Sequence, residues 1–397
     1  MKKILIGVII IMTIILIVLS YQNNEIKYGI KILTHNIFSI SEPLEYNSLY
    51  KVNDLTISNC DYYYLTLDDF EKNIYTNIIN SIKEYKTEVV IPEIKDKLKA
   101  EDINKKIQKV MNYIFLDHPE IYYVKPQYQI YISTNTLVDG IFLEIQYLYS
   151  KEEMLQKHKK INDKINSILS NISSNDLFQT EVQLHDYIAK NVDYLIYQDE
   201  TNIHKKYHSI EGALLEEKAV CDGLSKTLQI LLDNVGIESI FVTGLLDEVN
   251  HGWLMVKLEN EWYNLDVTAN KYINNENNVV QFVSHAYFNI TTEELEKTHI
   301  IDKKEILPVA NSMNNNYYKK KDLVLDINEP FSNKVVEIFT KQKNNEYVEF
   351  YTTYSKNVLS NIVKELYKTN YNDIKKLGNE IKLNYYLEGN TYIIKNY

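Results

Sequence analysis

Residues 219–236, with the sequence AVCDGLSKTLQILLDNVG, decide the fold of the central part of the chain. After Cys221 the apolar residues recur with the 3.6-residue period of an α-helix, at Leu224, Leu228, Leu231, Leu232 and Val235. Gly236 can end this helix because glycine readily adopts the left-handed conformation of a C′ residue. The stretch therefore predicts an amphipathic helix with Cys221 at its N-terminus.

Cys221 occupies the helix end at which a thiolate is most stable. The unsatisfied N–H groups and the positive end of the helix macrodipole favour the ionised sulfur. An ordinary thiol, with a pKa of about 8.5, is mostly protonated at neutral pH. The same N–H groups can also bind an oxyanion. The pattern indicates a nucleophile, whereas a lone cysteine in an apolar setting would be a core residue. Asp222 either tunes this thiol or complements the dipole.

A β-hairpin is expected after the helix. Residues 240–244 have the composition of a strand, and two further strands cover 251–258 and 261–268. Glu259 and Asn260 separate these two strands, and asparagine tolerates the positive φ that a two-residue turn requires. The chain should therefore run directly back along itself between these strands.

The register of this hairpin decides whether His251 can meet Asp266. The two-residue turn places His251 opposite Thr268 and Trp253 opposite Asp266. His251 and Asp266 then become diagonal neighbours on one sheet face, a separation that long or aromatic side chains can bridge. A slip of one residue would put them on opposite faces. A carboxylate in this place would fix the imidazole tautomer and stabilise the imidazolium.

With these residues, the segment from about 180 to 300 resembles the transglutaminase-like superfamily. The resemblance rests on Gly212, Ala213, Ala219 to Gly223, Gly236, Ile237, His251, Trp253, Trp262, Tyr263, Asp266 to Thr268, Tyr287, Phe288 and Thr291 to His299, and upstream on His185 to Tyr194. It implies an α+β protein with a papain-like core, in which a helix bearing the cysteine packs on an antiparallel sheet bearing the histidine and the aspartate. The resemblance also implies a catalytic triad of Cys221, His251 and Asp266, with no metal and no organic cofactor.

The resemblance implies covalent acyl transfer through a thioester. Cys221 would attack a carboxamide or peptide carbonyl and expel an amine. The acceptor would be water, as in a protease or deamidase, or a lysine amine, as in a cross-linking enzyme. The sequence leaves both open.

An alternative is a catalytically inactive domain of this fold that serves as a binding or scaffolding module at the cell surface. It is suggested by departures from the family pattern. Leu224 stands where such domains usually carry an aromatic residue, and Ala269 and Asn270 stand where they usually carry Trp and Asp.

Other polar residues are weaker candidates for a site. Tyr194 and Tyr197 lie upstream of the cysteine and are candidate side-chain donors to an oxyanion, or else aromatic core residues. His204 and His208 have a spacing that could hold a metal, but without a third ligand nearby a solvated turn is the expected structure. No partner pattern is evident for His118, His285 or His299.

The N-terminus has the pattern of a membrane-targeting segment. Lys2 and Lys3 precede an apolar run over 4–19, which is short for a full span but matches the central region of a signal peptide. An uncleaved signal anchor is expected first, and a cleaved signal peptide is the alternative. Either one predicts an extracytoplasmic protein whose substrates are proteins or peptides, possible cell-wall components among them.

Composition narrows the class of partner. The chain has 43 basic and 54 acidic residues, for a net charge of −11. We therefore expect no basic surface of the kind that binds nucleic acid. The two cysteines, Cys60 and Cys221, are too far apart in sequence for a paired metal motif, and the need for a free thiol at Cys221 opposes a disulfide between them. The oligomeric state is not indicated.

The chain should divide into four parts: a signal segment over 1–24, an N-terminal α+β domain over 25–172, the transglutaminase-like domain over 173–305, and a small C-terminal α/β domain over 306–397. In the N-terminal domain we expect helices over 67–85, 100–115 and 151–169, and strands over 87–91, 121–133 and 140–149. In the C-terminal domain we expect helices over 333–341 and 358–367, strands over 323–327 and 347–354, and a hairpin over 381–396. A structural or partner-binding role is expected for the C-terminal domain.

Overall fold

A computed structural model describes residues 24–38, 61–92, 99–135, 138–195, 205–274, 279–302, 306–354, 358–368, 385–388 and 390–395. Most of the predicted signal segment, together with Cys60, Tyr197 and His204, lies outside these residues. Within the described segments, no helix combines the length and the hydrophobicity needed to span a bilayer. The chain forms two compact units, Met1–Asp163 and Lys164–Tyr397. The domain boundaries at 172/173 and 305/306 stay predictions.

The first unit is an α+β structure around a three-stranded antiparallel sheet. Its strand order is β1-β3-β2, with β1 at Glu88–Pro92, β2 at Val124–Asn135 and β3 at Val138–Tyr147. The helices are α2 (Asn24–Phe38), α3 (Tyr62–Leu65), α4 (Asp69–Lys83), α5 (Ala100–Asp117), the short η1 (Pro119–Ile121) and most of α6 (Lys151–Ser170). The capping box between Asp68 and Glu71 explains where α4 begins. The predicted helices and strands are present here with their ends shifted by a few residues.

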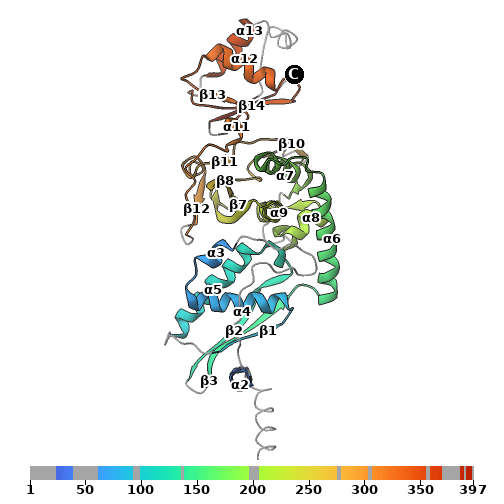
Figure 1. Cartoon of the computed structure of the whole chain (residues 1–397), viewed down its shortest axis with the longest axis vertical. Helices are drawn as coiled ribbons and strands as arrows, with labels where there is room; N and C mark the ends of the chain where they lie inside the picture. The colour runs from blue at the N-terminus through green and yellow to red at the C-terminus, as the bar shows by residue number, and fades with distance from the viewer. Residues whose placement is uncertain are drawn as a thin grey trace, which may run out of the picture. The chain divides into compact units, whose positions relative to one another are not determined.

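The second unit is built on a five-stranded antiparallel sheet with the order β11-β8-β7-β6-β12. These strands are β6 (Glu238–Leu246), β7 (Val249–Leu258), β8 (Glu261–Leu265), β11 (Phe288–Ile290) and β12 (His299–Ile301). Helix α9 (Cys221–Asn234) packs on β6 and β7, and it also contacts α7 (Leu177–Asn191) and α8 (Ile210–Leu215) (Figure 1). The expected α+β class, with a helix packed on an antiparallel sheet, is confirmed.

Helix α9 follows the predicted pattern closely. It begins at Cys221 with Val220 as its N-cap residue, and its apolar face is buried. The chain leaves the helix through Gly236 at φ +81°, a conformation that glycine adopts without strain. The local sequence therefore explains both ends of the helix.

The β7–β8 hairpin has the predicted turn and, within the strands, the predicted register. Glu259 and Asn260 both have positive φ, at 51° and 65°, as a two-residue hairpin turn requires. Leu258 pairs with Glu261, and Leu254 pairs with Leu265. The sequence prediction is therefore confirmed over this part of the ladder.

The two expected pairings nearest the site do not form. Strand β8 ends at Leu265, so Asp266 does not pair with Trp253 and Thr268 does not pair with His251. Instead, the N–H of Asp266 donates to the carbonyl of Tyr287 at 3.0 Å. The segment that leads into β11 takes this hydrogen bond, and the chain turns away from β7 after Leu265.

The C-terminal part of the second unit is a four-stranded sheet with helices packed against it. Its strand order is β13-β14-β16-β15, with β13 parallel to β14 and the other pairs antiparallel. The strands are β13 (Val324–Leu325), β14 (Tyr347–Thr352), β15 (Tyr385–Glu388) and β16 (Thr391–Lys395), and the helices are α11 (Tyr317–Lys320), α12 (Phe331–Lys341) and α13 (Val358–Lys368). Val335, Ile338 and Phe350 are among its buried core residues. These elements match the predicted α/β pattern.

Shorter elements complete the second unit. They are β4 (Asp193–Tyr194), the 3-10 helix η3 (Lys205–His208), β5 (Lys218–Ala219), β9 (Lys271–Asn274), β10 (Val279–Val283) and α10 (Thr292–Leu295). Strand β4 pairs with β5 in parallel, directly before the start of α9. The backbone ahead of Cys221 is therefore held by a neighbouring strand.

Candidate active site

The backbone around Cys221 is fixed by close packing against η3. The carbonyl of Tyr207 accepts a hydrogen bond from the N–H of Val220 at 3.0 Å. The same carbonyl lies so near Gly223 that a Cβ on this residue would be 2.4 Å from it. Cys221 itself carries a free, partly exposed thiol. The fold thus presents the sulfur at the first turn of α9.

His251 and Asp266 form a direct, buried pair. Nε2 of His251, on β7, lies 2.6 Å from Oδ2 of Asp266, just after β8. Oδ1 of Asp266 accepts the N–H groups of Thr268 at 2.8 Å and Ala269 at 3.0 Å. The tight turn after β8, rather than a ladder position, therefore aims the carboxylate at the imidazole.

The electrostatics of this pair favour the charged forms. Burial alone would raise the pKa of Asp266, but the charge and hydrogen bonds of His251 and His299 hold it well below its usual range. Burial would lower the pKa of His251, but the charge and hydrogen bond of Asp266, with a further contribution from Cys221, raise it to about 10. The pair is therefore an imidazolium and a carboxylate at neutral pH.

A second carboxylate approaches the sulfur. Sγ of Cys221 lies 3.7 Å from Oδ1 of Asp222, and Oδ2 of Asp222 lies 3.5 Å from Nδ1 of His208. Burial would raise the pKa of Asp222, but the hydrogen bond from His208 and the charge of Lys226 lower it. A negative charge here opposes ionisation of the thiol, whereas the helix terminus and His251 favour it. Asp222 is therefore placed to tune the thiol.

Comparison with known families agrees with this geometry. The family model of the transglutaminase-like superfamily matches residues 165–267, which include Cys221, His251 and Asp266. This segment is a transglutaminase-like domain. The match to this superfamily supports a cysteine-dependent enzyme family for the segment. No curated protein matches the chain.

Two solved structures share limited similarity with the chain. One is a TGase, at 16% identity and a TM-score of 0.26, with 46% of this chain and 51% of that chain covered. The other is a candidate cysteine protease from Cytophaga hutchinsonii, at 12% identity and a TM-score of 0.23, with 36% of this chain and 63% of that chain covered. The match thus spans about half the length of the TGase and under two thirds of the second protein.

The departures of the transglutaminase-like domain from its family pattern have structural roles. Leu224 is fully buried in α9. Asn270 is also buried; its Nδ2 lies 3.1 Å from Nε2 of His185, and its Oδ1 accepts the N–H of Tyr287 at 2.9 Å. Asn270 therefore braces the turn that begins at Asp266, and these substitutions leave the His251–Asp266 pair intact.

Of the two tyrosines expected as oxyanion donors, the structure describes one, Tyr194. Tyr194 lies on β4, and it pairs with Ala219 two residues before Cys221. Tyr197 lies outside the described residues. Tyr194 is thus near the backbone that leads to the nucleophile, and its role as a donor stays a prediction.

His299 is a member of the site that the sequence did not indicate. Its Nε2 lies 3.0 Å from Oδ2 of Asp266, the oxygen that also binds His251. His299 reaches this place because β12 pairs with β6, which sets His299 opposite Leu246. That pairing joins segments about 50 residues apart, so no local pattern around His299 could have revealed it.

Among the residues that the structure describes, two groups of side chains have donor atoms close enough to hold a metal: His251, Asp266 and His299, and His185, Asp186 and His285. In the first group, both histidines direct Nε2 at one carboxylate oxygen of Asp266. A metal would have to replace these two N–H groups. The hydrogen-bonded form satisfies all three residues without an ion.

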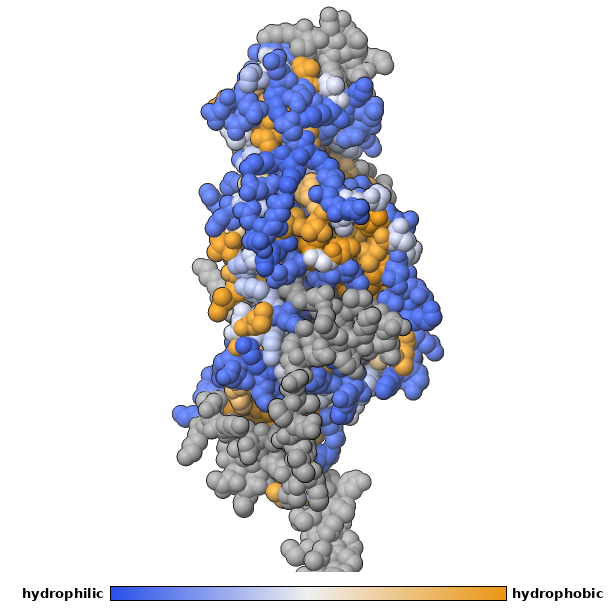
Figure 2. Space-filling model, in the orientation of Figure 1, coloured by the Kyte–Doolittle hydropathy of each residue, from blue (hydrophilic) through white to orange (hydrophobic). Residues whose placement is uncertain are grey.

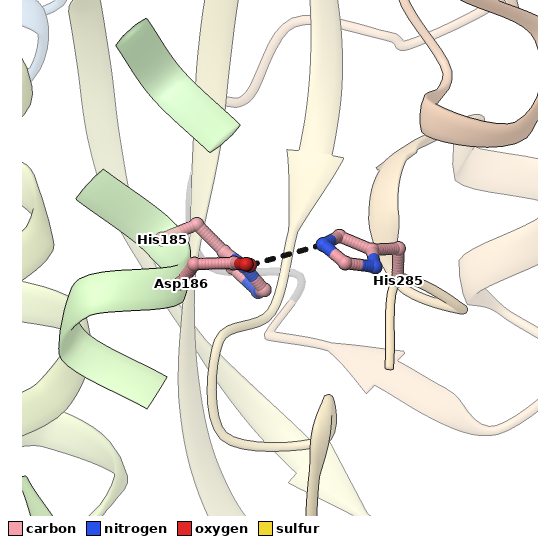
Figure 3. A group of neighbouring side chains, drawn as sticks. All are labelled: His185, Asp186 and His285. Atoms are coloured by element: carbon pink, nitrogen blue, oxygen red, sulfur yellow. Dashed lines mark hydrogen bonds and ion pairs between the residues drawn. The ribbon is translucent and has the colours of Figure 1, made fainter. Parts of the chain in front are cut away.

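The second group belongs to an ionic network in which the two histidines are buried and Asp186 is partly buried (Figure 3). Nε2 of His285 lies 3.0 Å from Oδ1 of Asp186, and its Nδ1 lies 2.6 Å from Oε1 of Glu349 on β14. Asn270 directs its amide at Nε2 of His185, so the proton of His185 is on Nδ1, facing Asp186 at 3.1 Å. Each of these ring nitrogens thus has a hydrogen-bonding or ionic partner within the network. The network joins α7 to the C-terminal sheet.

This network should make the stability of the second unit depend on pH. Burial would lower the pKa of His285, but the charges of Glu349 and Asp186 raise it to about 9. A histidine whose pKa is raised by folding stabilises the protein fully below pH about 6.5, and the contribution is lost as pH rises through about 9. Glu349→Gln should therefore cost about 3 kcal/mol at pH 6. Urea unfolding should show this difference shrinking at higher pH.

A matched control is Glu337→Gln, which removes an exposed carboxylate paired with Lys341 on α12. It should change the free energy of unfolding by less than about 1 kcal/mol at either pH. An equal loss for Glu349→Gln at low and high pH would show that the charge of His285 is not what stabilises this junction.

Proposed function

We propose that the transglutaminase-like domain is a cysteine-dependent acyltransferase or hydrolase that acts on protein or peptide amides through a thioester. The observation that carries the proposal is the pair between His251 and Asp266, 2.6 Å apart, together with the side-chain hydrogen bond between His251 and Cys221 at the start of α9. The helix terminus and the imidazolium both favour the thiolate. Asp266 holds the imidazole in the tautomer and orientation that the reaction needs.

The proposed reaction has two halves. In the first, the thiolate of Cys221 attacks the carbonyl carbon, and the tetrahedral intermediate collapses as His251 gives its proton to the leaving amine. The product is a thioester on Sγ, with His251 now neutral. In the second, His251 takes a proton from water or from an amine as that nucleophile attacks the thioester. The acyl group leaves the enzyme, and the thiolate and imidazolium return.

The second candidate is a binding or scaffolding module without catalysis. The observation that favours it is the carboxylate of Asp222, 3.7 Å from Sγ of Cys221. If this charge outweighs the helix terminus and His251, the thiol stays protonated and unreactive. The ionisation of Cys221 therefore separates the two functions.

Alkylation by iodoacetamide tests this ionisation directly. We expect Cys221 to react at pH 6 on the order of 100-fold faster than an ordinary thiol, whose thiolate is scarce so far below pH 8.5. Rates should be read from the Cys221 peptide by mass spectrometry, because Cys60 provides a second thiol in the chain. A rate that follows ionisation near pH 8.5 would rule out the enzyme and leave the binding module.

The identity of the acceptor needs a separate assay. The full chain should be incubated with casein and a fluorescent primary amine, and both amine incorporation and peptide release should be measured. Incorporation would identify a cross-linking activity, and release alone would identify hydrolysis. Cys221→Ala should abolish either activity, since no other group on the chain is proposed to form the thioester.

The surface of the second unit is compatible with a protein substrate. On the face shown in Figure 2, hydrophobic surface gathers at the level of α7 and α9. Leu177, Val249 and Ile300 are among the exposed large hydrophobic side chains of this unit. Exposed apolar surface of this kind can contact the side chains of a peptide.

We propose an extracytoplasmic location from the apolar run over 4–19 and the two lysines before it. Proteins or peptides of the cell surface or cell wall would then be the natural substrates, with the N-terminal segment holding the enzyme at the membrane. Protease treatment of intact cells tests the location. A chain that stays protected until the membrane is opened would place it inside the cell.

A further inference from the structure

Asp266 binds two imidazoles through one oxygen. Its Oδ2 lies 2.6 Å from Nε2 of His251 and 3.0 Å from Nε2 of His299. The side chain of His299 is fully buried, as is that of Asp266. The proposed reaction uses His251 and leaves His299 without a role.

The surroundings of His299 define its protonation. An ionised carboxylate only accepts hydrogen bonds, so Nε2 of His299 carries a proton and donates it to Asp266. Its Nδ1 lies 2.9 Å from Oγ1 of Thr298, and that hydroxyl accepts a bond from the hydroxyl of Tyr287 at 3.2 Å. The hydroxyl of Thr298 has two acceptors within reach, the carbonyl of Leu295 at 3.4 Å and Nδ1 of His299 at 2.9 Å, and the shorter contact favours donation to Nδ1. A neutral His299 is thus satisfied at both nitrogens.

Neighbouring rings hold His299 in place. Its ring centroid lies 5.2 Å from that of Trp253 and 5.2 Å from that of Tyr287, both in edge-to-face contact. The backbone is fixed by the pairing of β12 with β6. The N–H group of His299 therefore has a fixed direction toward Asp266.

We propose that His299 is a positioning residue of the proposed reaction, one that clamps the carboxylate of Asp266 and limits how tightly Asp266 holds the imidazolium of His251. Each N–H donor stabilises the negative charge of a carboxylate and so weakens its attraction for another donor. His251 must release its proton to the leaving amine, and an imidazolium held too tightly is a poor acid. This inference rests on the proposed function for its role in catalysis.

The test compares His299→Phe with His299→Gln. Phenylalanine keeps an aromatic ring beside Trp253 but removes the donor, whereas the amide nitrogen of glutamine can replace Nε2. In His299→Phe, an NMR titration should show the pKa of His251 shifted upward, because Asp266 then serves only one imidazole. The pH below which iodoacetamide alkylates Cys221 more slowly should also decrease, since a more stable imidazolium favours the thiolate.

His299→Gln should return both profiles to nearly those of the unchanged protein. The matched control is His158→Phe, which replaces a buried histidine of the first unit and should move neither profile. If folded His299→Phe titrates like the unchanged protein, or if glutamine fails to reverse its shift, His299 acts through packing alone and the inference is wrong. Alkylation of the unchanged protein at an ordinary rate would refute the proposed function, while the His251 titration would still decide the role of His299.

Discussion

Asp266→Asn is expected to lower turnover by about a thousandfold or more while the protein stays folded. The reason is the fixed orientation of the side chain. Oδ1 accepts two backbone N–H groups, from Thr268 and Ala269, so the amide oxygen of asparagine must take this position. The amide nitrogen then replaces Oδ2 and directs its protons at Nε2 of His251 and of His299.

Two donors cannot face each other, so the imidazolium of His251 must lose its Nε2 proton or turn away. Either change leaves an imidazole that cannot stabilise the thiolate and then protonate the leaving amine. The acyl-transfer assay with casein measures the loss, and thermal unfolding measures the fold.

The matched control is Asp222→Asn, which also replaces a carboxylate by an amide, near Sγ of Cys221. It removes a charge that opposes the thiolate, so alkylation of Cys221 should be at least as fast as in the unchanged protein. If Asp266→Asn instead kept full turnover, Asp266 would have no part in orienting His251.

The helix and the hairpin could be predicted because their determinants are local. The apolar period of 3.6 residues fixes the buried face of α9, and Gly236 fixes its end. Glu259 and Asn260 are the two residues of a tight turn, which determines the register of β7 and β8. Such patterns also located the flanking helices and strands, whose order could be predicted without any knowledge of function.

The contacts at Asp266 could not be predicted in the same way. Extending the hairpin register past Leu265 was wrong because Tyr287, about 20 residues on, takes the N–H of Asp266. The proximity of His251 and Asp266 was nevertheless expected, since the turn after β8 keeps the carboxylate on the side of the sheet that the register indicated. Contacts of this kind depend on which distant segment packs against the end of a strand. A single sequence carries little information about such non-local pairing.

The ionic network shows the same limit. Asp186 and His285 are 99 positions apart, and His285 and Glu349 are 64 apart. The residues next to each of these three in the sequence form no motif that would indicate a charged partner. Only the packing of α7 and β14 against the segment around His285 brings their charges together, and a buried charge is recognisable by its partners rather than by its own position.

Gly223→Ala should disable the proposed enzyme from outside the triad. A Cβ at this residue would lie 2.4 Å from the carbonyl oxygen of Tyr207, a backbone atom that cannot rotate away. The same carbonyl accepts the N–H of Val220, the N-cap residue directly before Cys221. Relieving the clash must therefore move η3 or the first turn of α9. We expect destabilisation of about 2 kcal/mol and about a hundredfold loss of turnover, since a shift of an ångström at a nucleophile is that costly.

Gly236→Ala provides the control for this prediction, because it lies at the other end of the same helix. Its φ of +81° strains any side chain, but apart from its chain neighbours no heavy atom lies within 4 Å of the added Cβ. It should cost about 1 kcal/mol in urea unfolding and leave the alkylation profile of Cys221 unchanged. If Gly223→Ala lost stability to the same extent but kept full turnover, the packing of η3 would support the fold without setting the place of the sulfur, and the position of Cys221 would have to be determined by the sheet beneath α9.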